Sequence, residues 1–158
     1  MLRHFSIDKY YVVKYRRFEM KLRRADRNDI DQLVKMNLEL MEDEQFDRPL
    51  EETQLRERME RFITDTVSHV FLIIQDTDVA GYAIVETNKT PIYLRHFFIK
   101  RNFREKHLGT GAFKLLLNEL KADRIDLDVM VWNKRGYAFW KSIGFTERCY
   151  AMTYQSSV

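Results

Sequence analysis

The residues best suited to chemistry lie in a basic stretch that ends in two glycines. In residues 97–112, FFIKRNFREKHLGTGA, an apolar run of strand length leads into a basic loop, and the glycines open a helix-like pattern. A helix N-terminus offers unpaired N–H groups and partial positive charge, and glycine allows close approach to the backbone. Arg101, Arg104 and Lys106 add positive charge, so the stretch predicts an anion site whose natural ligand is a pyrophosphate. A basic strand-to-helix turn that binds no ligand is the alternative interpretation.

The loop differs from two common phosphate-binding motifs. No Gly-Lys-Ser/Thr sequence follows it, which excludes a Walker loop. Its glycine spacing is not that of the dinucleotide fingerprint either. The choice between ligand and no ligand therefore depends on the surrounding elements.

Hydrophobic periodicity predicts the elements that would position this loop. Helices are predicted at about 29–41, 51–62, 109–120 and 136–143. Strands are predicted at 70–74 and 79–85, joined as a hairpin, and at 92–99, 125–131 and 145–154. Asp26 or Asn28 can cap the first helix, Pro49 follows it, and Gly144 suits a C-cap for the last helix. This order predicts an α/β (α+β) domain with a mixed sheet and helices packed on both faces.

Length and composition favour a single intracellular domain. The chain has 158 residues, of which 45% are hydrophobic and 32% charged. The lone Cys149 excludes an internal disulfide and fits the cytoplasm, and the four histidines lack metal-ligand spacing, so no metal is expected. No apolar run resembles a signal peptide or a membrane span, so no membrane association is expected. A net charge of +3 is mild, and nucleic acid is not an expected partner.

Residues 1–19 are interpreted as an N-terminal extension ahead of one domain at 20–158. They are basic and aromatic, and residues 10–13, YYVV, can form a strand beside the first core strand. Residues 21–25, KLRRA, then look like a fresh beginning, so Met20 as the natural start is the alternative.

Three motifs in the expected order resemble the GNAT superfamily of acetyl-CoA-dependent N-acetyltransferases. That family carries a Gln/Arg-x-x-Gly-x-Gly/Ala loop after its fourth strand. Here Arg104 and Gly109 match its ends, and His107 stands in place of the middle glycine. Residues 133–145, NKRGYAFWKSIGF, resemble the family segment Asn-x-x-Ala-x-x-Phe/Leu-Tyr-x-x-x-Gly-Phe, and KLRRADRNDI at 21–30 is a common opening. The resemblance covers roughly residues 21–155.

The resemblance implies a mostly antiparallel sheet whose fourth and fifth strands splay apart to admit acetyl-CoA as the acetyl donor. The backbone of Phe97, Phe98 and Ile99 would then pair with the pantetheine arm, with plain sheet core as the alternative for these residues. Asn133 and Trp140 would contact the cofactor from the downstream motif. The pyrophosphate would be held by the loop residues Arg104, Lys106, His107, Leu108, Gly109 and Thr110.

The implied reaction is direct attack of an amine on the acetyl thioester in a ternary complex. The N–H of Phe98 is the expected donor to the developing oxyanion. The family places a general acid, tyrosine, where this chain has Trp140, and Tyr137 is the expected substitute, with a packed aromatic as the alternative. His96 has a suitable intrinsic pKa for the base, and solvent is the alternative.

The expected acceptor is a primary amine of a small molecule or a peptide. Carboxylates in the first two helices would favour a cationic amine, although a solvated helix face is the alternative. They are Glu39, Glu42, Asp43, Glu44, Asp47, Glu51 and Glu52. A catalytically degenerate module that binds acyl-CoA as a sensor or interaction partner is the second hypothesis, and a homodimer is a further option without a specific signal.

Overall fold

The computed structural model describes residues 6–7, 10–15, 18–105 and 107–156. The chain forms two compact units, Met1–Asp128 and Val129–Val158, and each is described by itself. None of the helices in the described part of the chain is long and apolar enough to cross a membrane.

The first unit is built on one sheet whose strands lie in chain order. Neighbouring strands are antiparallel except for the last pair, β6 and β7, which is parallel. The predicted hairpin and the strand at 92–99 are confirmed. The strands are β1 (Ser6–Ile7), β2 (Tyr10–Tyr15), β3 (Phe18–Arg24), β4 (Ser68–Gln75), β5 (Asp78–Glu86), β6 (Ile92–Ile99) and β7 (Ile125–Asp126).

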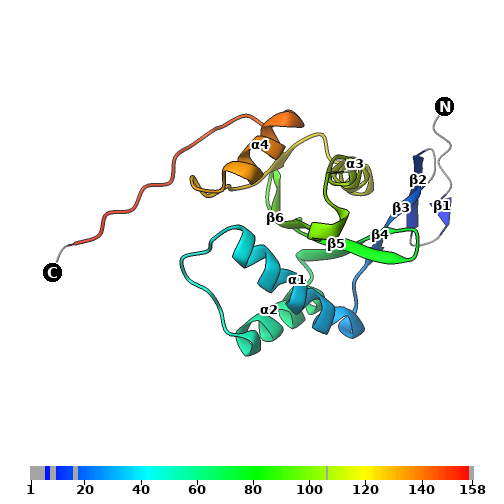
Figure 1. Cartoon of the computed structure of the whole chain (residues 1–158), viewed down its shortest axis with the longest axis horizontal. Helices are drawn as coiled ribbons and strands as arrows, with labels where there is room; N and C mark the ends of the chain where they lie inside the picture. The colour runs from blue at the N-terminus through cyan, green and yellow to red at the C-terminus, as the bar shows by residue number, and fades with distance from the viewer. Residues whose placement is uncertain (1–5, 8–9, 16–17, 106, 157–158) are drawn as a thin grey trace. The chain divides into compact units, whose positions relative to one another are not determined.

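Helices cover both faces of this sheet, as predicted. α1 (Ile30–Asp43) and α2 (Glu52–Thr64) lie on one side of β4 to β6, and α3 (Leu108–Leu120) lies on the other side (Figure 1). Short 3-10 turns, η1 (Arg27–Asp29) and η2 (Arg101–Phe103), precede α1 and follow β6. The larger helical layer is thus the one that packs α1 and α2 against the central strands.

The main core fills the space between α1, α2 and the sheet. Alternate residues of β4, β5 and β6 point to this side, which places Leu72, Tyr82 and Phe98 against Leu33 and Met59 of the helices. All five side chains are at most 2% exposed. Burial on this scale is the main stabilising contribution to such a layer.

A capping box begins the 3-10 turn η1, which leads directly into α1. The Asp26 side chain accepts the N–H of Asn28 over 2.8 Å, and the Asp29 side chain accepts the N–H of Asp26 over 2.9 Å. Arg23 of β3 pairs with Asp29 at 2.7 Å, which ties the helix start to the sheet. Of the two predicted caps, Asp26 thus caps η1, whereas α1 has Asp29 as its N-cap without a side-chain hydrogen bond.

The β6–β7 pair separates after two residues. Ile92 pairs with Ile125 and Tyr93 with Asp126, and no later residue of β6 pairs with β7. The predicted strand 125–131 is thus too long, because β7 ends where its hydrogen-bonded neighbour diverges. This short pairing is the splayed arrangement that was expected.

The second unit contains α4 (Lys134–Ser142). The Asn133 side chain accepts the N–H of Gly136 over 2.9 Å as its N-cap, and Gly144 has a φ of 107°, a conformation suited to glycine after a helix.

The strand predicted at 145–154 is wrong. Residues 145–156 form no strand, because a strand requires a hydrogen-bonded neighbour and none is present among the described residues.

Candidate cofactor and acyl-transfer site

The start of α3 presents three N–H groups that have no acceptor among the described residues. The first helical N–H that finds an acceptor is that of Gly111, which donates to the His107 carbonyl over 3.1 Å. The His107 side chain makes no capping hydrogen bond. The N–H groups of Leu108, Gly109 and Thr110 therefore donate to no other described residue, and they suit an anion such as a pyrophosphate.

His107 has a left-handed backbone conformation, which glycine adopts more readily than other residues. Its φ is 55° and its ψ is 14°, and Glu105 nearby has a φ of 66°. Histidine is among the residues that enter this region more readily than most. The substitution of histidine for glycine is therefore compatible with the loop geometry.

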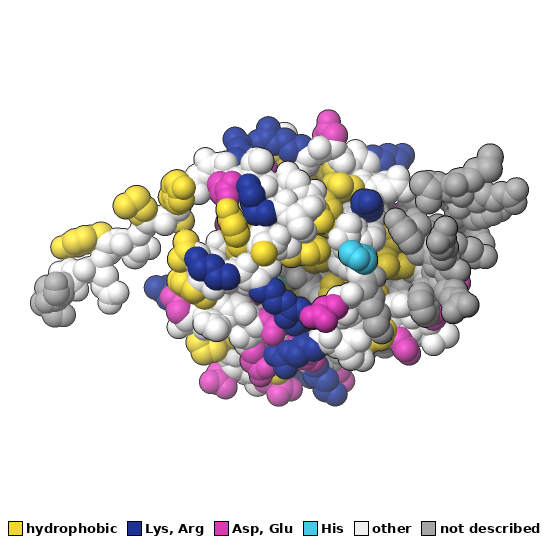
Figure 2. Space-filling model, turned by 45° about the horizontal axis from the view of Figure 1, so that its top comes forward, with side chains coloured by type: hydrophobic (Ala, Val, Ile, Leu, Met, Phe, Trp, Pro, Cys, Tyr) yellow, Lys and Arg dark blue, Asp and Glu magenta, His cyan; other side chains and the backbone are white. Residues whose placement is uncertain are grey.

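The arginines of the loop pair with the C-terminal end of α1. Arg104 forms an ion pair with Asp43 and donates from Nε to the Ile99 carbonyl over 2.6 Å. Arg101 contacts Glu42 and Asp43, each at 3.0 Å. Basic and acidic side chains lie side by side on the face shown in Figure 2. The side chains of Arg101 and Arg104, predicted to add positive charge for an anion, are thus paired with carboxylates, while Lys106 lies outside the described residues.

The same contacts determine the charge of Asp43. Desolvation alone would raise its pKa, but hydrogen bonds from Arg104 and Arg101 outweigh this effect and lower the pKa below its usual value. Asp43 is therefore ionised near neutral pH. The backbone amides of the loop, rather than these two arginine side chains, are left to meet an anion.

β6 directs the peptide group of Phe98 toward β5. A Cβ on Gly81 would come within 2.0 Å of the Phe98 carbonyl oxygen. The Lys100 N–H donates to Ala80 in the same direction over 2.8 Å. In a β-strand the N–H and C=O of one residue point to the same edge, and those of the next residue point to the opposite edge. The Phe98 N–H therefore points toward β5 together with its carbonyl, away from the edge that faces β7. This corrects the prediction that Phe98 supplies the oxyanion donor.

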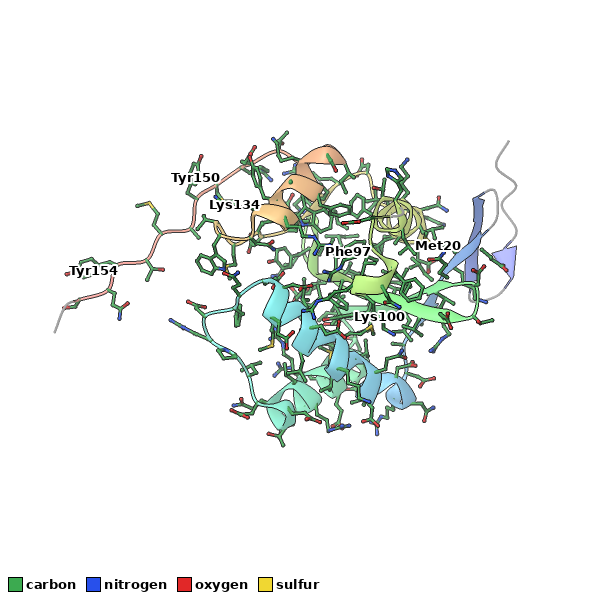
Figure 3. The ribbon with its side chains drawn as sticks, in the orientation of Figure 1. Met20, Phe97, Lys100, Lys134, Tyr150 and Tyr154 are labelled. Carbon is green, nitrogen blue, oxygen red and sulfur yellow. The ribbon has the colours of Figure 1, made fainter. Side chains whose placement is uncertain are left out.

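The neighbours of Phe98 have mixed roles. Phe97 and Ile99 direct their peptide groups to the β7 side, and the Phe97 ring lies 6.3 Å from the Phe113 ring of α3. Figure 3 shows Phe97 on β6 and Lys100 at its end. Phe98 itself is 2% exposed and belongs to the core, so the sheet-core interpretation holds for its side chain.

A bulge interrupts β6 close to the point where the pairing with β7 ends. Ile84 pairs with His96 and Val85 with Leu94, which leaves Arg95 as the extra residue. Bulges are frequent next to active sites, where they redirect side chains. Tyr93, just before the bulge, donates from its hydroxyl to Asp128 over 2.8 Å, and burial with this hydrogen bond raises the pKa of Tyr93.

His96 lies in a poorly basic position. Its Nδ1 is 3.1 Å from the Tyr82 hydroxyl, and the Phe62 ring lies edge-on at 6.0 Å. Burial, together with the positive charges of Arg58 and Arg95, lowers the pKa of His96 to about 3. The ring is therefore neutral near pH 7 and is a weaker base than a free imidazole, which argues against His96 as the general base.

The other predicted site residues belong to the second unit. Asn133 caps α4, and Trp140 packs between Phe139 and Phe145 at centroid distances of 4.8 and 5.1 Å. The Tyr137 hydroxyl donates to Glu147, and this hydrogen bond raises the pKa of Tyr137. The roles of these residues toward a cofactor stay predictions.

Several residues around His96 were missed by sequence reasoning. Tyr82, Glu86, Phe62 and Arg58 come from β5 and α2, and no motif links them to β6. Only the position of Arg58 and Phe62 on one helical face, four residues apart, could have indicated that they act together.

Metal-binding side chains and surface hollows are the remaining features that could form a site. Within the described ranges, no group of three or more His, Cys, Asp or Glu side chains could hold a metal ion. A surface hollow of about 690 Å³ is lined only by residues of η1, α1 and α2. It includes no residue of β6 or of the loop before α3, so we do not assign acyl transfer to it.

Comparison with known proteins agrees with this geometry. A possible acetyltransferase from Clostridium difficile 630 superposes with a TM-score of 0.70 and 17% identity, over 88% of this chain and 98% of that one. A predicted acetyltransferase from Clostridium acetobutylicum, solved with acetyl-CoA, gives 0.67 and 20% identity over 86% and 96% of the two chains. An aminoglycoside N-acetyltransferase in complex with CoA gives 0.68 and 13% identity over 92% and 99%.

These likenesses establish the fold, and the sequence profile of a family goes further. The profile of the acetyltransferase (GNAT) family matches residues 34–145, a span that starts within α1 and ends just after α4. It contains the loop before α3, the splayed β6–β7 pair and the segment 133–145. The chain therefore belongs to the acetyltransferase (GNAT) family.

Proposed function

We propose that this protein transfers the acetyl group of acetyl-CoA to a primary amine of a small molecule or a peptide, by direct attack in a ternary complex. The observation that carries the proposal is the start of α3, which has no side-chain cap. It follows β6, whose pairing with β7 stops at Tyr93. An anion site and an open strand edge are thereby joined by one continuous segment of chain.

The amides of Leu108, Gly109 and Thr110 hold the pyrophosphate in this proposal, and Arg104, Lys106 and His107 of the preceding loop are the further contacts proposed. The pantetheine arm follows the edge of β6 that faces β7. From Ile99 back to Arg95 the strand covers about 13 Å. The thioester therefore lies near the bulge at Arg95. Asn133 and Trp140 are the contacts proposed from the second unit.

The chemical step is nucleophilic substitution at the thioester carbonyl. The amine nitrogen forms the new C–N bond, the C–S bond breaks, and the thiolate leaves and takes up a proton. The amine must be neutral to attack, and deprotonating an alkylamine at pH 7 costs about 4 to 5 kcal/mol. The oxyanion donor is expected from a residue of β6 whose peptide group faces β7, a set that excludes Phe98.

Proton transfer is assigned to solvent and to Tyr137. Because His96 is neutral and weakly basic, we propose that ordered water removes the amine proton. Tyr137 is the proposed acid for the thiolate; its hydrogen bond to Glu147 raises its pKa, so it is protonated at pH 7.

Calorimetric titration tests the cofactor site. Acetyl-CoA and dephospho-CoA, which both contain the pyrophosphate, are expected to bind, and pantetheine, which lacks it, is expected to bind far more weakly. Gly109→Val should weaken acetyl-CoA binding at least tenfold. Gly111→Ala is the matched control one half-turn later, because the N–H of Gly111 already donates to His107. Equal affinity for all three ligands would remove the pyrophosphate site from the proposal.

A screen of primary amines separates the enzyme from a degenerate module. Release of CoA with the appearance of an N-acetylated product supports the transferase. Tight acetyl-CoA binding without turnover of any amine favours instead the second hypothesis, a sensor or interaction module, for which Trp140 in place of the family tyrosine is the motivating observation.

A further inference from the structure

Two arginines from different elements converge on one aromatic ring beside the bulge of β6. The guanidinium carbon of Arg58, from α2, is 5.4 Å from the centre of the Phe62 ring, and that of Arg95, from β6, is 6.0 Å from the same centre. Arginine stacks readily on aromatic faces and keeps its donors for an oxyanion. Because both positive charges lie against the same ring, a negatively charged group bound beside them would be stabilised.

The carboxylate present does not balance these charges. Glu86 of β5 pairs with Arg95 and also with Lys89, at 2.8 Å from the latter, so it serves two cations. Arg58 makes no hydrogen bond or ion pair with any residue that the structure describes. Arg58, Arg95 and Lys89 are thus three cations around one carboxylate, Glu86. The Arg58 guanidinium has no acceptor among the described residues.

The environment of Arg58 makes this imbalance costly. Burial and the neighbouring charge of Arg95 both lower the pKa of Arg58. The side chain of Arg95 is 30% exposed, so the cluster remains open to a ligand from solvent. An arginine that is partly withdrawn from water beside a second arginine is stabilised when an anion binds between them.

The position of the cluster connects it to the acyl-transfer site. Arg95 is the extra residue of the bulge and comes two positions after Tyr93, where the pairing of β6 with β7 ends. The proposed function places the thioester at this point. A substrate anchored at Arg58 and Arg95 would therefore present its neighbouring groups to the acetyl carbon.

We propose that Arg58 and Arg95 form an oxyanion subsite that selects acceptor amines bearing a carboxylate or a phosphate group close to the amine. This inference rests on the proposed acetyl transfer and specifies its acceptor class. It is an alternative to the expectation of a cationic acceptor drawn to acidic residues, of which Glu42 and Asp43 are paired with Arg101 and Arg104. The planar guanidinium donors match either oxyanion, and the test distinguishes the two.

Matched amine pairs provide the test. Tyrosine is compared with tyramine for the carboxylate, and phosphoethanolamine with ethanolamine for the phosphate, by kcat/KM for acetyl transfer. We expect at least tenfold preference for one anionic member over its neutral partner, and the pair that shows it identifies the oxyanion. Equal rates within both pairs would overturn the proposal.

Variants then assign the preference to the two arginines. Arg58→Gln and Arg95→Gln should each reduce kcat/KM for the anionic amine at least tenfold. Arg58→Gln, which lies on α2 and away from the cofactor edge of β6, should leave acetyl-CoA affinity and turnover of the neutral amine unchanged. Arg56→Gln is the control, since Arg56 lies on the same helix and pairs instead with Asp31. Equal losses for both members of a pair in the Arg58 variant would also contradict the subsite.

A binding measurement keeps this test independent of catalysis. Calorimetric titration of the same amine pairs requires no turnover. Binding of the anionic member that disappears in Arg58→Gln supports the subsite even if no acetyl transfer occurs, in which case the proposed function alone fails. Absence of any difference in binding and in rate overturns the subsite while leaving acetyl-CoA binding intact.

Discussion

His96 illustrates how neighbouring side chains change the chemistry of a single residue. Its intrinsic pKa suits a general base, but burial and the charges of Arg58 and Arg95 lower the pKa of His96 to about 3. Tyr82 also approaches its Nδ1 from inside the core. The residue type alone therefore predicts a base, whereas the surroundings make His96 a neutral packing and hydrogen-bonding group.

This change has a consequence for stability against acid. The pKa of His96 is near 6.5 when the chain is unfolded and about 3 when it is folded, so between these values the unfolded state binds more protons. The free energy of unfolding is therefore unaffected by protonation of His96 above pH 6.5. It decreases as the pH falls from 6.5 toward 3, because protonation of His96 then favours the unfolded state. From pH 7 to pH 5 the loss amounts to about 2 kcal/mol.

We therefore predict that His96→Gln unfolds with a smaller dependence on pH than the wild-type protein. Urea denaturation of both proteins at pH 7 and pH 5 gives the two differences in unfolding free energy. Carboxylates with lowered pKa values, such as Asp43 and Asp65, lose stability in both proteins and cancel in the comparison. Identical pH dependence in the two proteins would show that His96 is protonated in the folded state.

Among the elements, β5 and β6 approach each other closely at Gly81. A Cβ at this position would lie 2.0 Å from the Phe98 carbonyl oxygen, which is backbone and cannot rotate away. We predict that Gly81→Ala destabilises the protein by about 1 to 3 kcal/mol or more, measured by urea denaturation. Since β6 carries the proposed cofactor edge, acetyl-CoA affinity should fall as well.

Gly111→Ala is the contrasting substitution. Its Cβ would meet the flexible end of Met20 at 3.1 Å, beside α3 (Figure 3). Alanine also favours the helix by up to about 1 kcal/mol over glycine. We expect this variant to be as stable as the wild type or more stable. Equal effects of the two substitutions would contradict the close approach of β5 and β6 described here.

The contact between α1 and the loop before α3 depends on Asp43. The Arg104 side chain is 14% exposed, so Asp43→Asn would leave a largely buried guanidinium without its carboxylate. We predict a loss of about 1 to 3 kcal/mol in the free energy of unfolding. Asp31→Asn breaks the exposed pair with Arg56 and should lower the free energy of unfolding far less, because both of its charges remain in water. Comparable losses in both variants would mean that the Asp43 pair does not hold the loop in place.

For the whole molecule, sequence patterns predicted individual helices and strands better than contacts between segments that are far apart in the sequence. β6 matches its predicted bounds because an apolar run is limited by Pro91 on one side and a basic loop on the other. At position 107 the sequence shows only that histidine replaces the glycine of the family motif, and its left-handed conformation comes from the structure.

Contacts between distant segments are a different matter. Arg104 meets Asp43 across 61 positions, and Arg58 meets Arg95 through the same ring, so no local pattern contains either contact. The bulge at Arg95 depends on register against β5, which the periodicity of one strand does not determine.

Residues 146–156, which follow α4, are all exposed. Tyr150, Met152 and Tyr154 alternate as in a half-buried strand, yet they are 87%, 92% and 91% exposed and have no strand partner among the described residues. Without cofactor, the amides of 150–154 should exchange with deuterium within seconds, whereas those of β4 and β5 should be protected for far longer. Slow exchange at 150–154 would show that this segment pairs as a strand in solution. Slowing that appears only on adding acetyl-CoA would tie that pairing to occupation of the cofactor site.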